Sequence, residues 1–121
     1  MKITLAQQNY RIGDFEGNTS KIIQAIQTAR QEGSDLVVFS ELCVCGYPPR
    51  DFLEFHDFIE QCETSIHTIA EASAGIAVII GAPQINPDKA GKDLYNAAYF
   101  MVDGHIHSVV QKTCLPTYDV F

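Results

Sequence analysis

Three short apolar segments, separated by helical patterns, constrain the fold of this chain most. Residues 3–8 alternate weakly, as a strand does, and residues 36–39 form a continuous apolar run of strand length. Between them, apolar residues recur at helical spacing and predict a helix over 18–32, capped by Asn18 and stopped by Gly33. A strand, a helix and a strand in this order favour parallel pairing with a right-handed crossover.

A second helix and a third strand extend this order. Pro48-Pro49 ends regular structure, and an apolar stripe then predicts a helix over 51–75. Residues 76–81 are apolar and predict a third buried strand, whereas residues 83–93 contain Pro and Gly and predict a loop. The sequence therefore predicts the fold class α/β.

The last predicted elements form a hairpin. Asp103-Gly104 lies between the apolar runs 96–102 and 106–111, which indicates two antiparallel strands. Strands that are almost continuously apolar are expected to be covered on both faces. The two predicted helices suffice for one face only. We therefore expect part of a layered α/β domain, or one member of a tight assembly.

Composition narrows the function classes. A length of 121 residues suits one core. A net charge of −7 with only eight Lys and Arg argues against nucleic acid as a partner. The longest apolar stretch, residues 75–83, is too short to cross a membrane, and the first residues lack the features of a secretory signal, so we expect a cytoplasmic protein. In that compartment the four cysteines are expected to be reduced thiols.

Two charged residues are candidates for chemistry. Glu41 follows the strand at 36–39, and in open α/β sheets ligands and catalytic groups gather where strands end. A carboxylate buried there could take a proton near neutral pH, although a solvated loop acid is the alternative. Lys112 ends the last predicted strand, and its ammonium could stabilise an oxyanion or simply be exposed.

Neither a metal site nor a nucleophile can be nominated from the sequence. His105 and His107 share a face of a strand, but Cys43 and Cys45 lie far away in sequence, so no metal site is expected. Cys43 and Cys45 are close to Glu41, which could activate a thiol, and Cys114 is two residues beyond Lys112. Alternatively, these cysteines are small buried apolar side chains.

Three segments together resemble the nitrilase, or carbon-nitrogen hydrolase, superfamily. The opening Met1-Lys-Ile-Thr-Leu-Ala-Gln-Gln-Asn9 is similar to the first strand of that family. Ser40-Glu41-Leu42, followed by Gly46-Tyr-Pro-Pro-Arg-Asp-Phe-Leu53, is similar to its glutamate loop, although the family usually has proline in place of Ser40. Lys112-Thr-Cys-Leu-Pro-Thr-Tyr-Asp-Val-Phe121 resembles most specifically the N-terminal glutaminase domain of glutamine-dependent NAD synthetases.

The resemblance implies a fold and roles for three residues. Residues 1–121 would be the N-terminal portion of a nitrilase-like glutamine amidotransferase domain, an incomplete part of a four-layer α-β-β-α sandwich. Glu41 would be the general base, Lys112 would stabilise the tetrahedral intermediate, and Tyr118 would help line the glutamine pocket. The nucleophilic cysteine would lie beyond residue 121, so this chain alone is expected to be inactive.

The resemblance also implies the parent reaction and its partners. The parent enzyme would hydrolyse glutamine through a cysteine thioester and pass ammonia to a separate domain, which uses ATP and Mg to amidate deamido-NAD. No cofactor is expected in this chain itself. Its expected partners are glutamine or another small amide, the remainder of the parent chain and further copies of itself. The alternatives are another nitrilase-type amidase or carbamoyl hydrolase, and a non-catalytic α/β interaction module.

Overall fold

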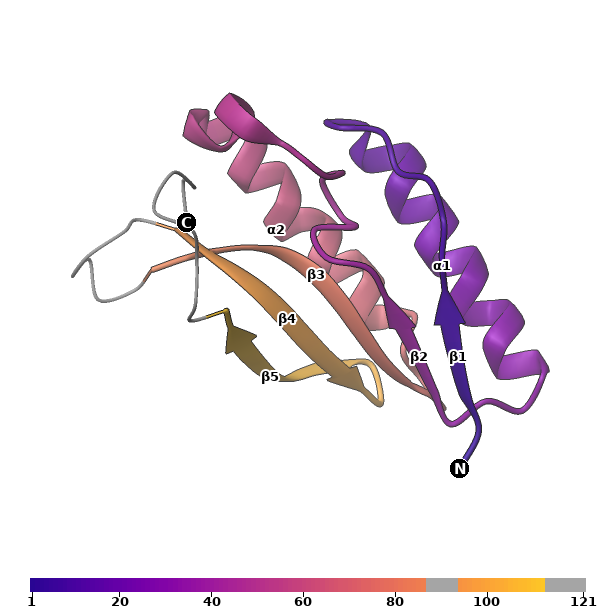
Figure 1. Cartoon of the computed structure of the whole chain (residues 1–121). Helices are drawn as coiled ribbons and strands as arrows, with labels where there is room; N and C mark the ends of the chain where they lie inside the picture. Colours follow the sequence, from indigo (N-terminus) through magenta and orange to yellow (C-terminus); the bar gives the residue numbers. More distant parts are fainter. Residues whose placement is uncertain (87–93, 113–121) are drawn as a thin grey trace.

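Parallel pairing of the first three strands follows from the strand and helix order (Figure 1). The computed structural model describes residues 1–86 and 94–112. The parallel strands are β1 (Ile3–Ala6), β2 (Leu36–Phe39) and β3 (Ala77–Ile85). They are connected by α1 (Phe15–Gln31) and α2 (His56–Glu71). The prediction of an α/β fold is confirmed.

A hairpin completes the sheet. β4 (Leu94–Val102) pairs antiparallel with β3, and β5 (His105–Gln111) pairs antiparallel with β4, so the strand order is β1-β2-β3-β4-β5. Asp103 and Gly104 have φ values of +53° and +84°, as a two-residue turn between twisted strands requires. Since each antiparallel step reverses the chain, β5 runs in the same direction as β3.

Helix α1 begins earlier than its apolar pattern indicates. The Asp14 side chain accepts a hydrogen bond from the Gly17 nitrogen at 3.0 Å and caps the helix. The prediction of Asn18 as the cap is wrong, because this residue lies within the first turn and is fully buried. Its side chain instead exchanges hydrogen bonds with the Arg11 backbone and donates to the Val44 carbonyl at 3.2 Å.

The helix predicted over 51–75 is divided. A 3₁₀ helix, η1 (Arg50–Glu54), precedes α2, and Phe55 between them has extended backbone angles. The rings of Phe52 and Phe58 stack across this break with centroids 5.6 Å apart. Sequence periodicity missed the break because apolar residues continue at helical spacing across it, although Phe52 and Phe55 are 50% and 59% exposed.

β3 continues through Pro83, which was predicted to lie in a loop. Pro83 pairs with Asn96 of β4, whereas β2 pairs with β3 only as far as Ile79. The Asn96 carbonyl points towards β5 and accepts from the Lys112 nitrogen at 2.8 Å, so the ring nitrogen of Pro83 faces away from β4. No ladder hydrogen bond is lost there, and the strand tolerates proline.

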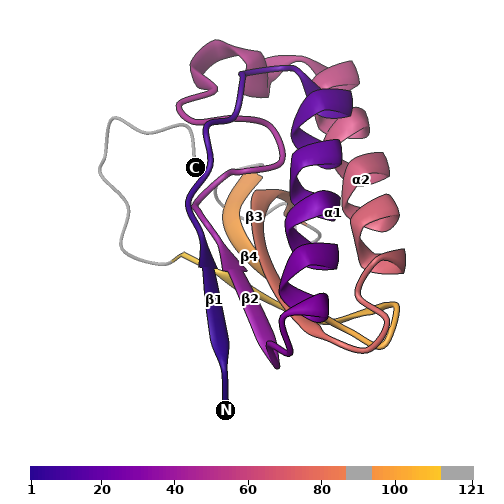
Figure 2. The same ribbon diagram turned by 90° about the vertical axis from the view of Figure 1, so that its right-hand side faces the viewer.

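Both helices lie on the same side of the sheet (Figure 2). Between helices and sheet lies an apolar core of fully or nearly fully buried side chains. It includes Ile22, Ile26, Ile69, Val78, Ile80 and Met101. The opposite face carries exposed apolar residues, among them Leu5 at 71% and Val110 at 65% exposure. Within the described residues this face has no covering layer, as the pattern of two helices predicted.

Within residues 1–86 and 94–112, no helix is both long enough and apolar enough to cross a membrane.

Gly46 ends the loop after β2 and has no room for a side chain. Its φ is +86°, and an added Cβ would lie 2.7 Å from the Ile12 nitrogen. Gly33 has a similar φ of +81°, but nothing lies within 4 Å of an added Cβ. We expect Gly33→Ala to cost about 1–2 kcal/mol of unfolding free energy through left-handed strain. Gly46→Ala should cost about 1–3 kcal/mol more because the methyl meets backbone.

Urea unfolding of the two variants measures this difference directly. Equal losses of unfolding free energy would show that the loop moves away from Ile12 without cost.

Candidate active site

The residues that follow β2 and β5 meet at one edge of the sheet, and a pocket opens there. β2, β3 and β5 run in the same direction, so their carboxyl ends lie at this edge (Figure 1). The pocket has a volume of about 290 Å³, near the lower end of the range for small-molecule sites. Its lining includes Glu41, Gly81, Asn96 and Lys112.

The two predicted site residues that the structure describes are in contact. The Lys112 Nζ donates to the Glu41 Oε1 at 3.1 Å, although 71 positions separate the two residues. The side chains are 42% exposed for Glu41 and 48% exposed for Lys112. Of the two interpretations of Glu41, the structure supports that of a solvated acid, because no described element covers the open side of the pocket.

The loop that carries Glu41 is held in place by buried side chains and by hydrogen bonds to β3. Leu42, Cys43, Val44 and Cys45 are all buried, so Glu41 stands at the exposed end of a buried segment. The Val44 nitrogen donates to the Gly81 carbonyl at 3.2 Å, and the Gly46 nitrogen donates to the Leu42 carbonyl at 2.9 Å. These hydrogen bonds join the loop to β3 and close it on itself.

Leu42, directly after Glu41, adopts a strained backbone conformation. Its φ is +53°, in the left-handed region that residues with a Cβ rarely occupy. The side chain is only 1% exposed, so its burial offsets the strain. Strained residues of this kind cluster at functional sites, where surrounding contacts hold them in place. The strain therefore marks the Glu41 loop as a segment with a required shape.

None of the three described cysteines offers an accessible thiolate to this pocket. Cys43, Cys45 and Cys62 are free thiols with no exposed surface. Burial raises the pKa of Cys43 to about 12, and the Cys43 Sγ donates to the Gly81 carbonyl at 3.7 Å. A hydrogen bond with Cys45 and burial raise the pKa of Cys62. Of the two interpretations of Cys43 and Cys45, the structure supports that of small buried side chains.

The other residues that the sequence suggested for binding or catalysis are not among the described residues that line the pocket. Tyr118, predicted to line the glutamine site, and Cys114 lie outside the described residues. His105 and His107 are exposed, and the His107 ring packs edge-on against Phe100 with centroids 5.5 Å apart. In the described part of the chain, no three His, Cys, Asp or Glu side chains gather as a metal site would need.

Two pocket residues were missed in the sequence. Gly81 lies in the floor beside the Glu41 loop, and the buried Asn96 holds the Lys112 backbone through its carbonyl. No motif marks either residue. Both could have been found only from the register of β3 with β4, which depends on tertiary structure.

The arrangement combines a carboxylate, an ammonium and a small pocket. A carboxylate can accept a proton from a nucleophile or from water. An ammonium held a fixed distance away can stabilise negative charge that develops on a carbonyl oxygen. The site is therefore equipped for addition to a carbonyl or amide carbon, with the attacking atom supplied from elsewhere.

Comparison with known proteins gives one matching family. The family model described as carbon-nitrogen hydrolase matches residues 2–119. A curated relative from Thermotoga maritima, named glutamine-dependent NAD(+) synthetase, is 40% identical over 121 residues. The match covers 100% of this chain and 20% of that relative. The chain therefore spans about a fifth of the length of this relative.

Solved structures share the fold. A glutamine-dependent NAD(+) synthetase from Cytophaga hutchinsonii superposes with a TM-score of 0.86 at 26% identity, covering 95% of this chain and 19% of that chain. An amidase from Nesterenkonia sp. superposes with a TM-score of 0.77 at 23% identity. That match covers 96% of this chain and 44% of the amidase, and at this identity it shows a common fold alone.

Proposed function

Because the chain belongs to the carbon-nitrogen hydrolase family, we propose that it is the N-terminal part of the glutaminase domain of a glutamine-dependent NAD synthetase. The observation that carries this proposal is the contact of Glu41 with Lys112 at the pocket edge. Relatives that match the whole chain at about 40% identity bear the name of that enzyme, which favours glutamine as the amide.

In the proposed reaction Glu41 moves protons and Lys112 stabilises charge. A cysteine thiol loses its proton to the Glu41 carboxylate, and its sulfur attacks the side-chain amide carbon of glutamine. The Lys112 ammonium stabilises the oxyanion of the tetrahedral intermediate. Glu41 then returns the proton to the departing ammonia, which leaves a thioester. Water then gives a proton to Glu41 as its oxygen attacks the thioester carbon. The carbon-sulfur bond breaks, Glu41 returns the proton to the departing sulfur, and glutamate and the free thiol are released.

The attacking thiol comes, in this proposal, from the remainder of the parent chain. The three described cysteines are buried, and the pKa of Cys43 is raised to about 12, so none is a suitable nucleophile near neutral pH. Tyr118 would line the glutamine pocket from the segment after Lys112. This chain thus supplies the base and the oxyanion donor.

The exposed face of the sheet supports a further layer from the parent chain. The apolar side chains of Ile3, Leu5 and Val110 are 51%, 71% and 65% exposed, and both helices lie on one side of the sheet (Figure 2). A second sheet and its helices would cover them and complete a four-layer α-β-β-α sandwich. Without that layer, the same face would favour association between copies of this chain.

The two products have different fates in the proposed parent enzyme, which we expect to be cytoplasmic. Glutamate leaves, and ammonia passes to a separate domain that binds ATP and Mg and amidates deamido-NAD. No residue of this chain is assigned to ATP or to Mg.

The experiment that tests the function compares two proteins. One is the 121-residue chain, and the other, called the extended enzyme below, is this chain followed by the remainder of its parent sequence. We expect the extended enzyme to release glutamate from glutamine, whereas the 121-residue chain releases none, because the proposed nucleophile belongs to the remainder of the parent sequence. Coupled assays for glutamate and ammonia measure both rates. Glutamate release by the 121-residue chain would contradict the proposed source of the nucleophile.

A further inference from the structure

We propose that Gly81 of β3 is a positioning residue for Glu41, because the absence of a side chain there lets the Glu41 loop lie directly on the strand. This inference rests on the proposed glutaminase function, in which Glu41 must lie at a set distance from both thiol and amide. Gly81 would act on Glu41 through the backbone of the loop that lies against it.

Gly81 lies in β3 just beyond the point where β2 stops pairing with it. The pairing of β2 with β3 ends at Val38 and Ile79. Beyond these residues, the edge of β3 that faces β2 has no strand partner. The Gly81 carbonyl points to this vacated side, where it accepts the Val44 nitrogen at 3.2 Å and the Cys43 thiol at 3.7 Å. The Glu41 loop thus continues the hydrogen bonding that β2 leaves unfinished.

The loop approaches Gly81 so closely that no other residue fits. A Cβ at Gly81 would lie 2.5 Å from the Leu42 nitrogen, 2.8 Å from the Ser40 carbonyl oxygen and 3.1 Å from the Glu41 carbonyl carbon. All three atoms are backbone, and they flank or belong to Glu41. A methyl group at Gly81 must therefore displace the peptide units on both sides of the carboxylate.

A second contact fixes the loop from the opposite side. The Asn18 Nδ2 of α1 donates to the Val44 carbonyl at 3.2 Å, while the Val44 nitrogen donates to Gly81. The Val44 residue is thus held between α1 and β3. Because Lys112 reaches the pocket from β5, across β4, the separation of Glu41 and Lys112 is set through Gly81 and the β3 to β5 pairing.

The test is Gly81→Ala in the extended enzyme, with glutamine hydrolysis measured over a range of glutamine concentrations. We expect kcat to fall by about 10- to 100-fold, since misplacement of a catalytic group by about 1 Å has effects of that size. KM should stay within about threefold of its original value, because the loss concerns the transition state and not ground-state binding.

Gly17→Ala is the matched control. Gly17 lies in the first turn of α1, and its added Cβ would meet only the Asp14 carboxylate, a side-chain end that can move. We expect this variant to keep the original kcat and KM. Unchanged kcat in Gly81→Ala, or a raised KM with unchanged kcat, would overturn the positioning role. An inactive unsubstituted enzyme would instead refute the proposed function.

A second variant applies if Gly81→Ala does not fold, as judged by circular dichroism. Asn18→Ser removes the contact with the Val44 carbonyl, together with the hydrogen bonds of the Asn18 amide with the Arg11 backbone, and leaves β3 unaltered. The same fall in kcat with a nearly constant KM is then expected, and an unchanged kcat would overturn the proposal.

Discussion

Glu41→Gln in the extended enzyme is expected to lower kcat for glutamine hydrolysis by about 10²- to 10⁴-fold, the usual contribution of a general base. The amide has nearly the size of the carboxylate but cannot accept the thiol proton. Because the Lys112 Nζ can still donate to an amide oxygen at this position, loss of the local structure is not expected. Glutamate release at saturating glutamine, with circular dichroism as the check of folding, measures the effect.

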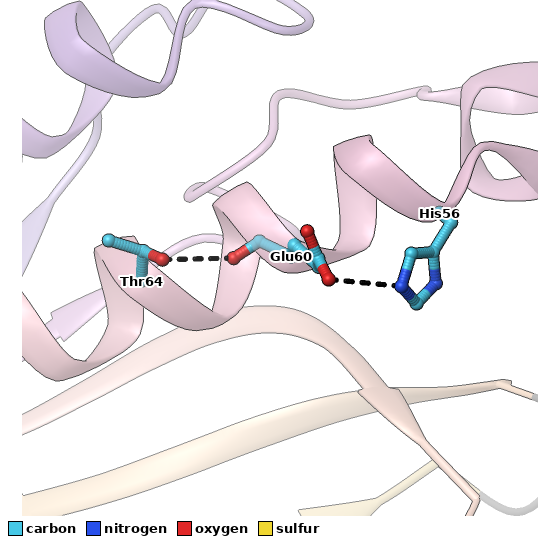
Figure 3. Close-up of polar contacts among 3 residues, drawn as sticks. All are labelled: His56, Glu60 and Thr64. Carbon is cyan, nitrogen blue, oxygen red and sulfur yellow. Dashed lines mark hydrogen bonds and ion pairs between the residues drawn. The ribbon is translucent and has the colours of Figure 1, made fainter.

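Glu60→Gln is the matched control for this change. Glu60 lies on α2, and its carboxylate pairs with the His56 Nε2 at 3.0 Å, with both side chains largely exposed (Figure 3). The substitution therefore removes a carboxylate from an ion pair without touching the pocket. We expect unchanged kcat, and stability within about 1 kcal/mol, as for other exposed ion pairs. Equal losses in Glu41→Gln and Glu60→Gln would refute the role of Glu41.

Lys112→Met in the extended enzyme is expected to lower kcat by about 10²- to 10³-fold, the size of effect seen when one oxyanion donor is removed. Methionine keeps much of the side-chain length and removes the charge. Lys21→Met is its control, because Lys21 is an exposed lysine of α1 that donates to the Asn9 carbonyl at 2.7 Å. A kcat in Lys112→Met equal to that of Lys21→Met would refute the oxyanion role.

The double variant distinguishes two forms of cooperation. If Glu41 and Lys112 act in one catalytic unit, the combined variant loses little more than the more damaging single change. If the fall in kcat of the double variant equals the product of the two single falls, the two groups act independently.

Much of the fold could be predicted because local patterns and the final packing agree. The run at β2 was bounded correctly at both ends, and Asp103-Gly104 identified a two-residue turn that suits a tight hairpin. The start of α1 was missed because the Asp14 cap precedes the first apolar residue of the stripe. Pro83 was missed because its place in β3 depends on where β2 stops pairing.

The site was predicted in part for a topological reason. Glu41 and Lys112 both follow strands, and strand direction brings these strand ends to one edge of the sheet. Whether Glu41 and Lys112 are buried or exposed was left open, because a sequence does not state which face of a loop remains uncovered. The supporting role of Gly81 depends on a backbone approach of 2.5 Å, and no residue pattern records such a distance.

The sheet has the same strand order in space as along the chain, and this allows it to be assembled while the polypeptide is still being made. Each strand from β2 to β5 pairs with the strand that precedes it in the sequence, so none has to wait for a later strand to supply its neighbour. Glu41 takes its place on β3 at an intermediate stage. Lys112 follows β5, the last strand that the structure describes, so the contact between Glu41 and Lys112 forms only once all five described strands have been made.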